Sequence, residues 1–453
     1  MNAEALKHYT ILGFLIAVLI GVSILFKNQT PEKRQKLFNW LLGFLAFGTL
    51  FLIFVGAMVA STRSGMAFMD WPTSDGLIWP GLDKWIHQED MFWEHIHRLI
   101  AEGVGYVAIC LLIWSFFVDD KKYVKACSLL LLLIILQGIF GGLTVKRMTA
   151  WWTSTLHGVV AQMVFCMMTV LFFSSRAKTK QIEPKVDDDS WLYKLPRLVC
   201  VVVLSQLILG ASFRHKMKES FFSSKISNQQ LKELTADKAS LSFSHKGNYT
   251  VKVKVEKAAE VRGQIFVMGQ KTQNELYKNV EAIDKLGEAD LGEFEAQPQK
   301  NYRLTFNDEV KSIRLMGKKP VSIVVGGKSS ELDFDIVYKE VLDGNTHLLW
   351  AHIAFAIVVT LSVLLLGMYL LKKKEDLAIL GTLGKGMLLT ILIQITLGVI
   401  AFMTVSDRQE GIYDQTKTIL TSAHLANGAL LLALCVVADY FCRKGFVKSQ
   451  DAA

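Results

Sequence analysis

The chain has 453 residues, 51% of them hydrophobic, and a formal net charge of +9 at pH 7. A soluble domain of this length needs a more polar surface, so the composition excludes an ordinary soluble globular protein and favours a membrane protein. The positive charge is spread over many short segments, which disfavours a nucleic-acid partner and suggests a topology signal.

Nine apolar runs follow one another along the chain, and about 20 apolar residues suffice to cross a bilayer as a helix. The runs are 10–27, 37–61, 93–118, 124–146, 152–174, 196–213, 347–371, 378–404 and 419–442. The first run has no small-residue cleavage site, and its cationic cluster follows it instead of preceding it. We therefore expect an extra, retained transmembrane helix within residues 1–31 and not a signal peptide.

Basic clusters occur in alternate loops between the runs. They are KNQTPEKRQK, DDKKYVK, SSRAKTKQIEPK, LKKKED and, after the last run, CRKGFVK. Loops rich in Lys and Arg face the cytoplasm. The sequence therefore predicts a multi-pass protein of the bacterial cytoplasmic (inner) membrane, surrounded by lipid, with its N-terminus outside and its C-terminus in the cytoplasm.

A polar segment, residues 216–343, separates the sixth run from the seventh. Several of its stretches alternate apolar and polar residues: NYTVKVKVEK, GQIFVMG, KSIRLMG, KPVSIVVGG and LDFDIVYKEV. Alternation with period two, bounded by Gly, Asn and Asp, is typical of strands. We expect an extracytoplasmic β-rich domain here, entered through a short helix or linker in SSKISNQQLKELTADKAS.

The remaining runs show an internal repeat. The second and sixth runs end in VGAMVASTRSGM and LGASFRHKM, the fourth and eighth contain LQGIFGGLTV and IQITLGVIAFMTV, and the fifth and ninth open with TSTLHGVVAQMVF and LTSAHLANGALLL. This order predicts an all-α polytopic membrane protein with two parallel four-helix-bundle repeats. The N-terminal half is 32–215, the C-terminal half combines the helix 196–213 with 344–446, and 447–453 is a tail.

One histidine lies at a matching level in four of the runs: His97, His157, His352 and His424. Each half contributes two. A pair of imidazoles facing each other across a four-helix bundle is the usual way to hold haem iron by two axial ligands. A histidine near a helix end is more often a polar residue at the membrane surface, but ionisable groups inside membranes usually mark function. The matched placement favours axial ligation.

Glu94 precedes His97 by three residues and so shares its helix face. Arg98 follows Glu94 by four residues, so the simplest alternative is an ion pair at the membrane surface. A carboxylate beside an iron ligand could instead bind water or move protons. The matching residue of the other half is Leu349, which predicts one reacting haem and one electron-carrying haem.

Three further histidines lie outside this pattern. His95 is about 200° around the helix from His97, so we expect it to face elsewhere and to lie at the membrane interface. We expect the same of His347. His215, beside Arg214, is placed to meet a haem propionate.

Taken together, these residues resemble the haem A synthase family of cytochrome oxidase assembly. The similar stretches are EHIHR at 94–98, TLHGVVAQ, WAHIAFA and SAHLANG around the other histidines, and the loops TRSGMAFMDWP at 62–72 and LGASFRH at 209–215. The resemblance covers the second to ninth runs. It implies eight helices in two four-helix halves.

The resemblance also implies an activity. His97 and His157 would hold the substrate haem O, whose C8 methyl group would be oxidised to the formyl group of haem A, with Glu94 as the catalytic carboxylate. His352 and His424 would hold a haem b cofactor that passes electrons onward.

Other implied roles concern the edge of the substrate and the partners. A loop with Trp71 would cover that edge, and Arg63, Arg98 and Arg214 would pair with propionates. Haem O synthase, cytochrome oxidase assembly proteins and a second copy of the chain are the implied partners.

Two other functions remain open. The chain could be a non-catalytic di-haem b-type membrane cytochrome for electron transfer, or a haem-delivery or oxidase assembly factor whose β domain docks an oxidase subunit. The single acid, Glu94, favours the enzyme, whereas a docking domain fits either alternative.

Overall fold

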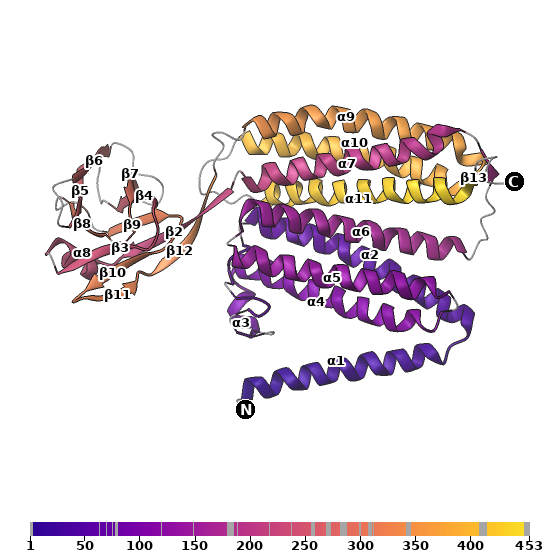
Figure 1. Cartoon of the computed structure of the whole chain (residues 1–453), viewed down its shortest axis with the longest axis horizontal. Helices are drawn as coiled ribbons and strands as arrows, with labels where there is room; N and C mark the ends of the chain where they lie inside the picture. Colours follow the sequence, from indigo (N-terminus) through magenta and orange to yellow (C-terminus); the bar gives the residue numbers. More distant parts are fainter. Residues whose placement is uncertain are drawn as a thin grey trace. The chain divides into compact units, whose positions relative to one another are not determined.

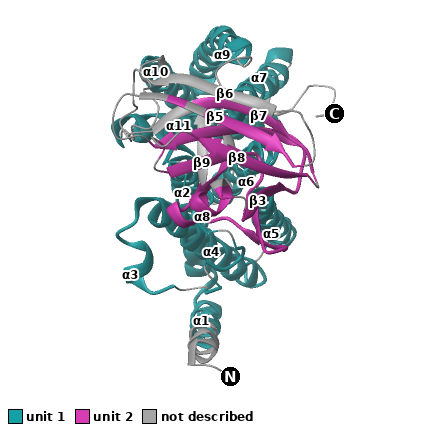
Figure 2. Ribbon diagram, turned by 90° about the vertical axis from the view of Figure 1, so that its left-hand side faces the viewer, with its two compact units in different colours: residues 1–217, 342–453 teal, residues 218–341 magenta. Residues whose placement is uncertain are grey.

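The computed structural model describes residues 3–447 apart from 63, 69, 75, 78–79, 119, 148, 179–184, 188, 217, 237, 255–258, 269–272, 281–287, 299, 307–309, 311, 341–345 and 407–414. The chain divides into two compact units, shown in Figure 2. Unit 1 comprises Met1–Met217 and Leu342–Ala453, and unit 2 is Lys218–Val341. Each unit has a hydrophobic core of its own.

Unit 1 is built from long helices. They are α1 (Ala3–Lys27), α2 (Pro31–Thr62), α4 (Glu89–Ser115), α5 (Lys122–Lys146), α6 (Trp151–Lys178), α7 (Ser190–Lys216), α9 (Thr346–Lys372), α10 (Ala378–Ser406) and α11 (Gln415–Gly445), with the short α3 (Leu82–Trp85) and η1 (Lys373–Glu375) between them. Each predicted apolar run lies on one long helix. Among the described residues, eight of these helices are long and apolar enough to cross a membrane. The exception is α1, whose apolar part within the described residues is the shorter Gly13–Lys27, so its membrane crossing remains a prediction.

The eight candidate spans form two groups of four. In the first helix group, α4 and α6 each contact both α2 and α5. In the second helix group, α9 and α11 each contact both α7 and α10. Figure 1 shows each group as long helices lying side by side. Each group therefore closes into a ring of helices around an interior of its own.

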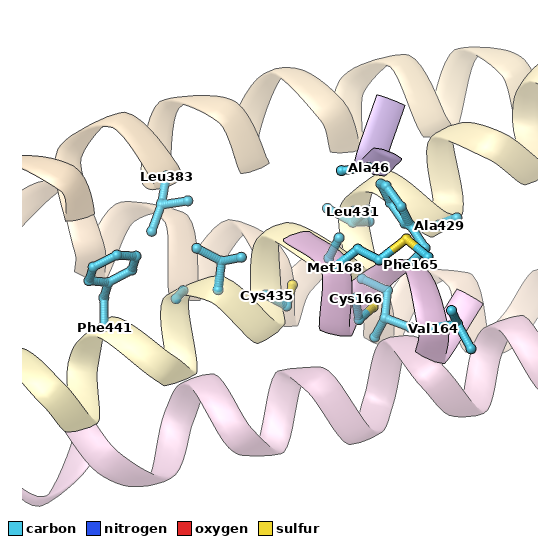
Figure 3. Close-up of a cluster of buried hydrophobic side chains, with 14 of the residues drawn as sticks. Ala46, Val164, Phe165, Cys166, Met168, Leu383, Ala429, Leu431, Cys435 and Phe441 are labelled. Atoms are coloured by element: carbon cyan, nitrogen blue, oxygen red, sulfur yellow. The ribbon is translucent and has the colours of Figure 1, made fainter. Parts of the chain in front are cut away.

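The two helix groups meet through α11, which packs against α2 and α6, and through the contact between α6 and α7. Figure 3 shows side chains of α6, among them Phe165 and Met168, close to Ala429 and Cys435 of α11. All of these are buried. Because apolar residues of both groups fill this seam, it joins the groups by packing and leaves the ring interiors to other side chains.

At the end of the helices opposite the histidines, residues 185–187 and 189, which connect the two groups, make contacts with the second group. Strand β1 (Lys185–Val186) pairs in parallel with β13 (Phe446–Val447), which follows α11. Lys373 Nζ donates to Asp187 over 2.5 Å, and Tyr369 donates to Asp189 over 2.6 Å. The Lys373 hydrogen bond lowers the pKa of Asp187 below its usual value. We call β1, β13 and these two aspartate contacts the clasp.

Unit 2 consists of two antiparallel sheets. The six-stranded sheet has the order β11-β10-β3-β8-β5-β6, and the five-stranded sheet has the order β12-β2-β9-β4-β7. The strands are β2 (Lys218–Ile226), β3 (Ala239–Phe243), β4 (Gly247–Lys254), β5 (Ala259–Val267), β6 (Gln273–Val280), β7 (Glu288–Ala296), β8 (Asn301–Phe306), β9 (Ser312–Gly317), β10 (Val321–Val325), β11 (Lys328–Glu331) and β12 (Phe334–Glu340). Alternate residues of these strands, such as Tyr249, Val251 and Val253 of β4, are buried in one core. The predicted β-rich insert is confirmed.

The ends of unit 2 are neighbours. Strands β2 and β12 pair antiparallel, with Lys218 directly opposite Glu340. Paired residues of antiparallel strands have Cα atoms about 5 Å apart. The unit therefore leaves and rejoins unit 1 through two adjacent points of the chain. The predicted helix at its start is α8 (Asn228–Thr235), where Ser227 accepts a hydrogen bond from the backbone N–H of Gln230.

Candidate functional site

Each of the four predicted ligand histidines packs its ring against a glycine of the preceding long helix in its group. A Cβ atom added at these glycines would lie 2.7–3.3 Å from the Cε1 atom of the ring. The pairs are Gly56 (α2) with His97 (α4), Gly141 (α5) with His157 (α6), Gly210 (α7) with His352 (α9) and Gly398 (α10) with His424 (α11). The distances at Gly56 (2.9 Å) and Gly210 (2.7 Å) are shorter than real Cβ atoms allow, so at these two positions the helix backbone approaches the ring because the residue lacks a side chain. The distances at Gly141 (3.3 Å) and Gly398 (3.1 Å) are tight.

Gly210→Ala should therefore destabilise the second helix group. The new methyl group would lie 2.7 Å from His352 Cε1, and overpacking of this kind costs about 1–3 kcal/mol. We expect a lower midpoint of thermal unfolding in detergent. Gly48→Ala is the matched control, since a Cβ at Gly48 meets nothing within 4 Å. Equal midpoints for the two variants would contradict the close approach of α7 to the ring.

Three of the histidines also meet a glutamine that lies one helical turn before the glycine. Gln137 Nε2 is 3.0 Å from His157 Nδ1 and donates to the main-chain oxygen of His157 over 2.8 Å. Gln206 Nε2 donates to the main-chain oxygen of His352 over 2.9 Å and is 3.5 Å from its Nε2. Each amide therefore joins the helix that carries it to the histidine of the next helix.

The third glutamine belongs to a larger network. Gln394 Nε2 lies 3.3 Å from Nδ1 and 3.2 Å from Nε2 of His424. Its amide oxygen accepts a hydrogen bond of 2.7 Å from Asn427, which also donates to the main-chain oxygen of Thr390. His424 is thus contacted from α10 by the amide of Gln394, and Asn427 holds that amide in place.

The four histidines fall into two pairs, His97 with His157 and His352 with His424, and each ring packs against a glycine of its own helix group. Each pair belongs to one helix group, α4 with α6 and α9 with α11. The geometry thus brings together the residues that the sequence pairs, while their role as iron ligands remains a prediction.

Glu94 and Arg98 form an ion pair that holds a loop. The side chains are 5% and 12% exposed, and Glu94 Oε1 is 2.5 Å from Arg98 Nη2. Glu94 Oε2 accepts from the backbone N–H of Phe68 over 2.9 Å. Arg98 also donates to the main-chain oxygens of Phe68, Asp70 and Thr73. The pair is therefore buried under the loop after α2, not exposed at a surface.

The same loop covers His95. The ring is 1% exposed, its Nδ1 is 3.2 Å from Ser74 Oγ, and its centroid is 4.6 Å from that of Trp85. His95 is therefore buried beneath the loop, and its position at the level of the membrane interface remains a prediction. The residue makes different contacts from His97, as helix geometry requires, and the loop folds back over the start of α4. His347 is exposed.

Trp71 extends this loop across to α5. A Cβ added at Gly142 would lie 2.5 Å from the Trp71 ring. The preceding residue, Gly141, faces His157. The loop therefore reaches from the Glu94 carboxylate on α4 to the helix that carries the glycine of the second histidine.

Arg214 connects the two helix groups at the histidine end. Its Nη2 donates to the main-chain oxygen of Ala57 over 2.7 Å and contacts Ser61 Oγ, both on α2. Ser61 Oγ is 3.3 Å from Thr421 Oγ1 on α11. Arg214 therefore joins α7 of the second helix group to α2 of the first. Arg63 lies outside the described residues.

The residues of each group fit a haem. Imidazole nitrogens are axial ligands of haem iron, and each group supplies two rings. Within the described part of the chain, the Nδ1 atoms of His97 and His352 are buried without a hydrogen-bond partner, as are the amide oxygens of Gln137 and Gln206. The same residues contain no cluster of three or more His, Cys, Asp or Glu placed for a bare metal ion. Two imidazoles in each group match the two axial positions of a haem iron.

The glutamines and glycines around the histidines were not predicted as functional residues. A signal for them exists in the sequence, because the spacing Gln-x-x-x-Gly recurs as QGIFG at 137–141, QLILG at 206–210 and QITLG at 394–398. In α2 the corresponding stretch is LIFVG at 52–56, with Leu52 in place of the glutamine.

Residues 39–246 match the COX15-CtaA family, described as a cytochrome oxidase assembly protein. Among curated proteins, the chain is similar to "Heme A synthase" of Rhizobium rhizogenes, 29% identical over 28% of this chain and 36% of the relative. It is likewise similar to "Heme A synthase" of Shewanella oneidensis, 29% identical over 38% of this chain and 55% of the relative. The matched regions thus span between about a third and just over half of these relatives' length. No solved structure matches the chain.

Proposed function

The chain is a membrane protein of the COX15-CtaA haem A synthase family, and we propose from this premise that it oxidises the C8 methyl group of haem O to the formyl group of haem A. The observation that carries the proposal is the family match over residues 39–246, which contain Glu94, His97 and His157. The net change is –CH3 + H2O → –CHO + 4 H⁺ + 4 e⁻. The site must therefore bind a farnesylated haem, accept protons and pass electrons on.

In the proposal, the first helix group binds the substrate. His97 and His157 orient haem O from α4 and α6, and the loop with Trp71 covers its edge. Glu94 is the proton acceptor. Its carboxylate is held by the Phe68 N–H and by Arg98, so it stays in one place while a proton transfers.

The second helix group would hold haem b between His352 and His424. Iron bound in this way supplies one-electron transfer. Arg214 carries a positive charge from α7 to α2, and in the proposal it balances propionate charge between the two haems, with Arg98 and Arg63 serving the substrate side.

We further propose that the two helix groups are parallel repeats and that the histidine end faces outward. The same succession of contacts supports the repeat, since in both groups a glycine of one helix meets a histidine of the next. The basic loops support the orientation. Unit 2 and the N-terminus would then lie outside the bacterial inner membrane and the clasp in the cytoplasm, where haem O synthase, oxidase assembly proteins or a second copy can dock.

Haem analysis tests the function directly. The protein would be produced in a host that makes haem O but no haem A, and the extracted haems would be separated by chromatography. Haem A should appear only when the protein is present, with the red-shifted spectrum of a formyl haem. Bound haem without any haem A would contradict the proposal.

A di-haem electron-transfer cytochrome is the second candidate, and one observation favours it. Both oxygens of Glu94 already have partners, Phe68 and Arg98, so the acid could serve only to hold the loop. Such a protein would contain haem b at both sites and would form no haem A, so the same chromatogram separates the two functions. A haem-delivery factor would instead release its haem to an oxidase subunit.

Unit 2 should be dispensable for haem binding. Its only histidine is His245, which hydrogen-bonds within the unit to Ser244, and its ends lie side by side at Lys218 and Glu340. Replacing residues 218–340 by a short Gly/Ser linker should leave the absorption spectrum and the haem content per protein unchanged. A second variant with a linker twice as long controls for strain. Loss of haem from both well-folded variants would contradict the expectation.

A further inference from the structure

Three of the four ligand histidines are held by a glutamine, and the fourth is not. We propose that Gln137, Gln206 and Gln394 are positioning residues for axial imidazoles, and that Leu52 makes His97 more easily displaced than His157, the other ligand of its group. This inference rests on the proposed function, because it assumes that the histidines bind haem.

The positions correspond along the helices. In α5, α7 and α10 the glutamine lies four residues before the glycine that faces the ring, so the two share one helix face. In α2 the same position, four residues before Gly56, is Leu52. Its side chain is a hydrocarbon and can neither donate nor accept a hydrogen bond.

His97 shows the consequence of this difference. Its ring touches Gly56 as the other rings touch their glycines. Within the described residues, however, its Nδ1 is buried and has no hydrogen-bond partner. His352 Nδ1 also lacks one within these residues, but Gln206 still donates to the main-chain oxygen of His352. The ring facing His97 across the group, His157, has Gln137 3.0 Å from the same nitrogen. The two ligands of the first group therefore differ: among the described residues, the ring of His157 has a glutamine beside its Nδ1, and the ring of His97 has none.

Hydrogen bonding to the outer nitrogen strengthens a ligand imidazole. A metal-bound histidine usually gives its other ring N–H to an acceptor, which fixes the ring orientation and makes the ligand more basic; loss of that partner typically costs about 10–100-fold in metal affinity or activity. When Nε2 binds iron, Nδ1 carries the proton and needs an acceptor. In the structure the amide nitrogen of Gln137 faces Nδ1 and donates to the main-chain oxygen of His157. Rotation of the amide would turn its unpartnered oxygen toward a protonated Nδ1 and would exchange the bond to the main-chain oxygen for one from Nδ1–H.

If His97 is the ligand that is displaced, the axial position that becomes free in the first group lies next to Glu94. His97 lies one turn after Glu94 on the same face of α4. If His97 is the weakly held ligand, a small neutral molecule should enter on that side, within reach of the carboxylate and under the loop. In the second group, Gln206 holds His352 through its main-chain oxygen, and Gln394 Nε2 lies 3.3 Å from Nδ1 and 3.2 Å from Nε2 of His424. Among the described residues, both of these histidines therefore have a glutamine contact that His97 lacks.

Carbon monoxide titration of the reduced, haem-loaded full-length protein tests the inference. The unmodified protein should bind carbon monoxide at the first-group haem only. Leu52→Gln should give His97 its missing partner, lower the affinity for carbon monoxide by about 10-fold or more and shift the midpoint potential of that haem downward. Gln137→Leu should act in the opposite direction and raise the affinity. Phe51→Gln is the matched control, because its side chain lies beside Leu52 in sequence but is 47% exposed on the outside of the bundle.

The outcomes separate this inference from the proposed function. Haem-loaded Leu52→Gln and Gln137→Leu proteins whose carbon monoxide affinities equal that of the unmodified protein would overturn the positioning role. If Leu52→Gln fails to fold, the rise expected for Gln137→Leu decides alone. Absence of haem from the unmodified protein would instead overturn the haem-binding function itself.

Discussion

Glu94→Gln is expected to leave haem bound to the protein and to stop the formation of haem A. The amide keeps the shape of the side chain but cannot accept a proton. Loss of one acid–base group costs about 10²–10⁴ in rate, so extracted haems should contain haem O and little or no haem A. Chromatography of the haems from cells that produce the variant measures the effect.

The contacts of Glu94 require a control for this experiment. Its partner Arg98 is 12% exposed, and breaking a buried ion pair by removing one charge costs about 3–5 kcal/mol. The variant therefore also weakens the attachment of the loop at Phe68. Arg98→Gln loosens the same loop but keeps the carboxylate. It should lower the thermal midpoint similarly and, because Arg98 is also proposed to pair with a propionate, its haem A is compared per bound haem O, where it should clearly exceed that of Glu94→Gln. Equal loss of haem A per bound haem O in both variants would assign Glu94 to holding the loop.

The two histidine pairs should be separable by mutation. His352→Ala should remove the haem of the second helix group, about half of the total haem, and leave the first group loaded. His97→Ala should do the reverse. The physical reason is that each pair lies within its own ring of helices, and the seam between the rings is filled by apolar side chains. Haem content per protein and the absorption spectrum measure the effect.

His347→Ala is the matched control for the second pair. It removes an exposed histidine from the same helix, five residues before His352, and should leave both haems bound. If His352→Ala empties both sites in a protein that remains folded, the two-site arrangement is wrong. Haem b in the remaining site after His97→Ala would support the assignment of the second group as the electron carrier.

The helices and the histidines could be predicted from local sequence. The length of an apolar run predicts a transmembrane helix. The four histidines, His97, His157, His352 and His424, occur in order within similar stretches of sequence. The five predicted alternating stretches of the insert fall on β4, β5, β9, β10 and β12. The order of the strands in the sheets could not be predicted, because pairing depends on residues far apart in the chain.

The surroundings of Glu94 could not be predicted for the same reason. Helix periodicity relates Glu94, His97 and Arg98 to one another, but it carries no information about the loop that covers them. The burial of His95 against Trp85 and Ser74 depends on how that loop folds back. The glutamine contacts could be predicted in part. The repeated Gln-x-x-x-Gly spacing is visible in the sequence, but only the structure shows that these residues contact the histidines.

The clasp has a consequence for the order in which the protein is made. Strand β1 is synthesised directly before α7, whereas its partner β13 follows α11. The first ring of helices can close once α6 has been synthesised. Strand β1 has no partner until β2 to β12 and the four long helices α7, α9, α10 and α11 have been synthesised. Pairing of β1 with β13 is thus a late step of biogenesis, because β13 is synthesised only after α11.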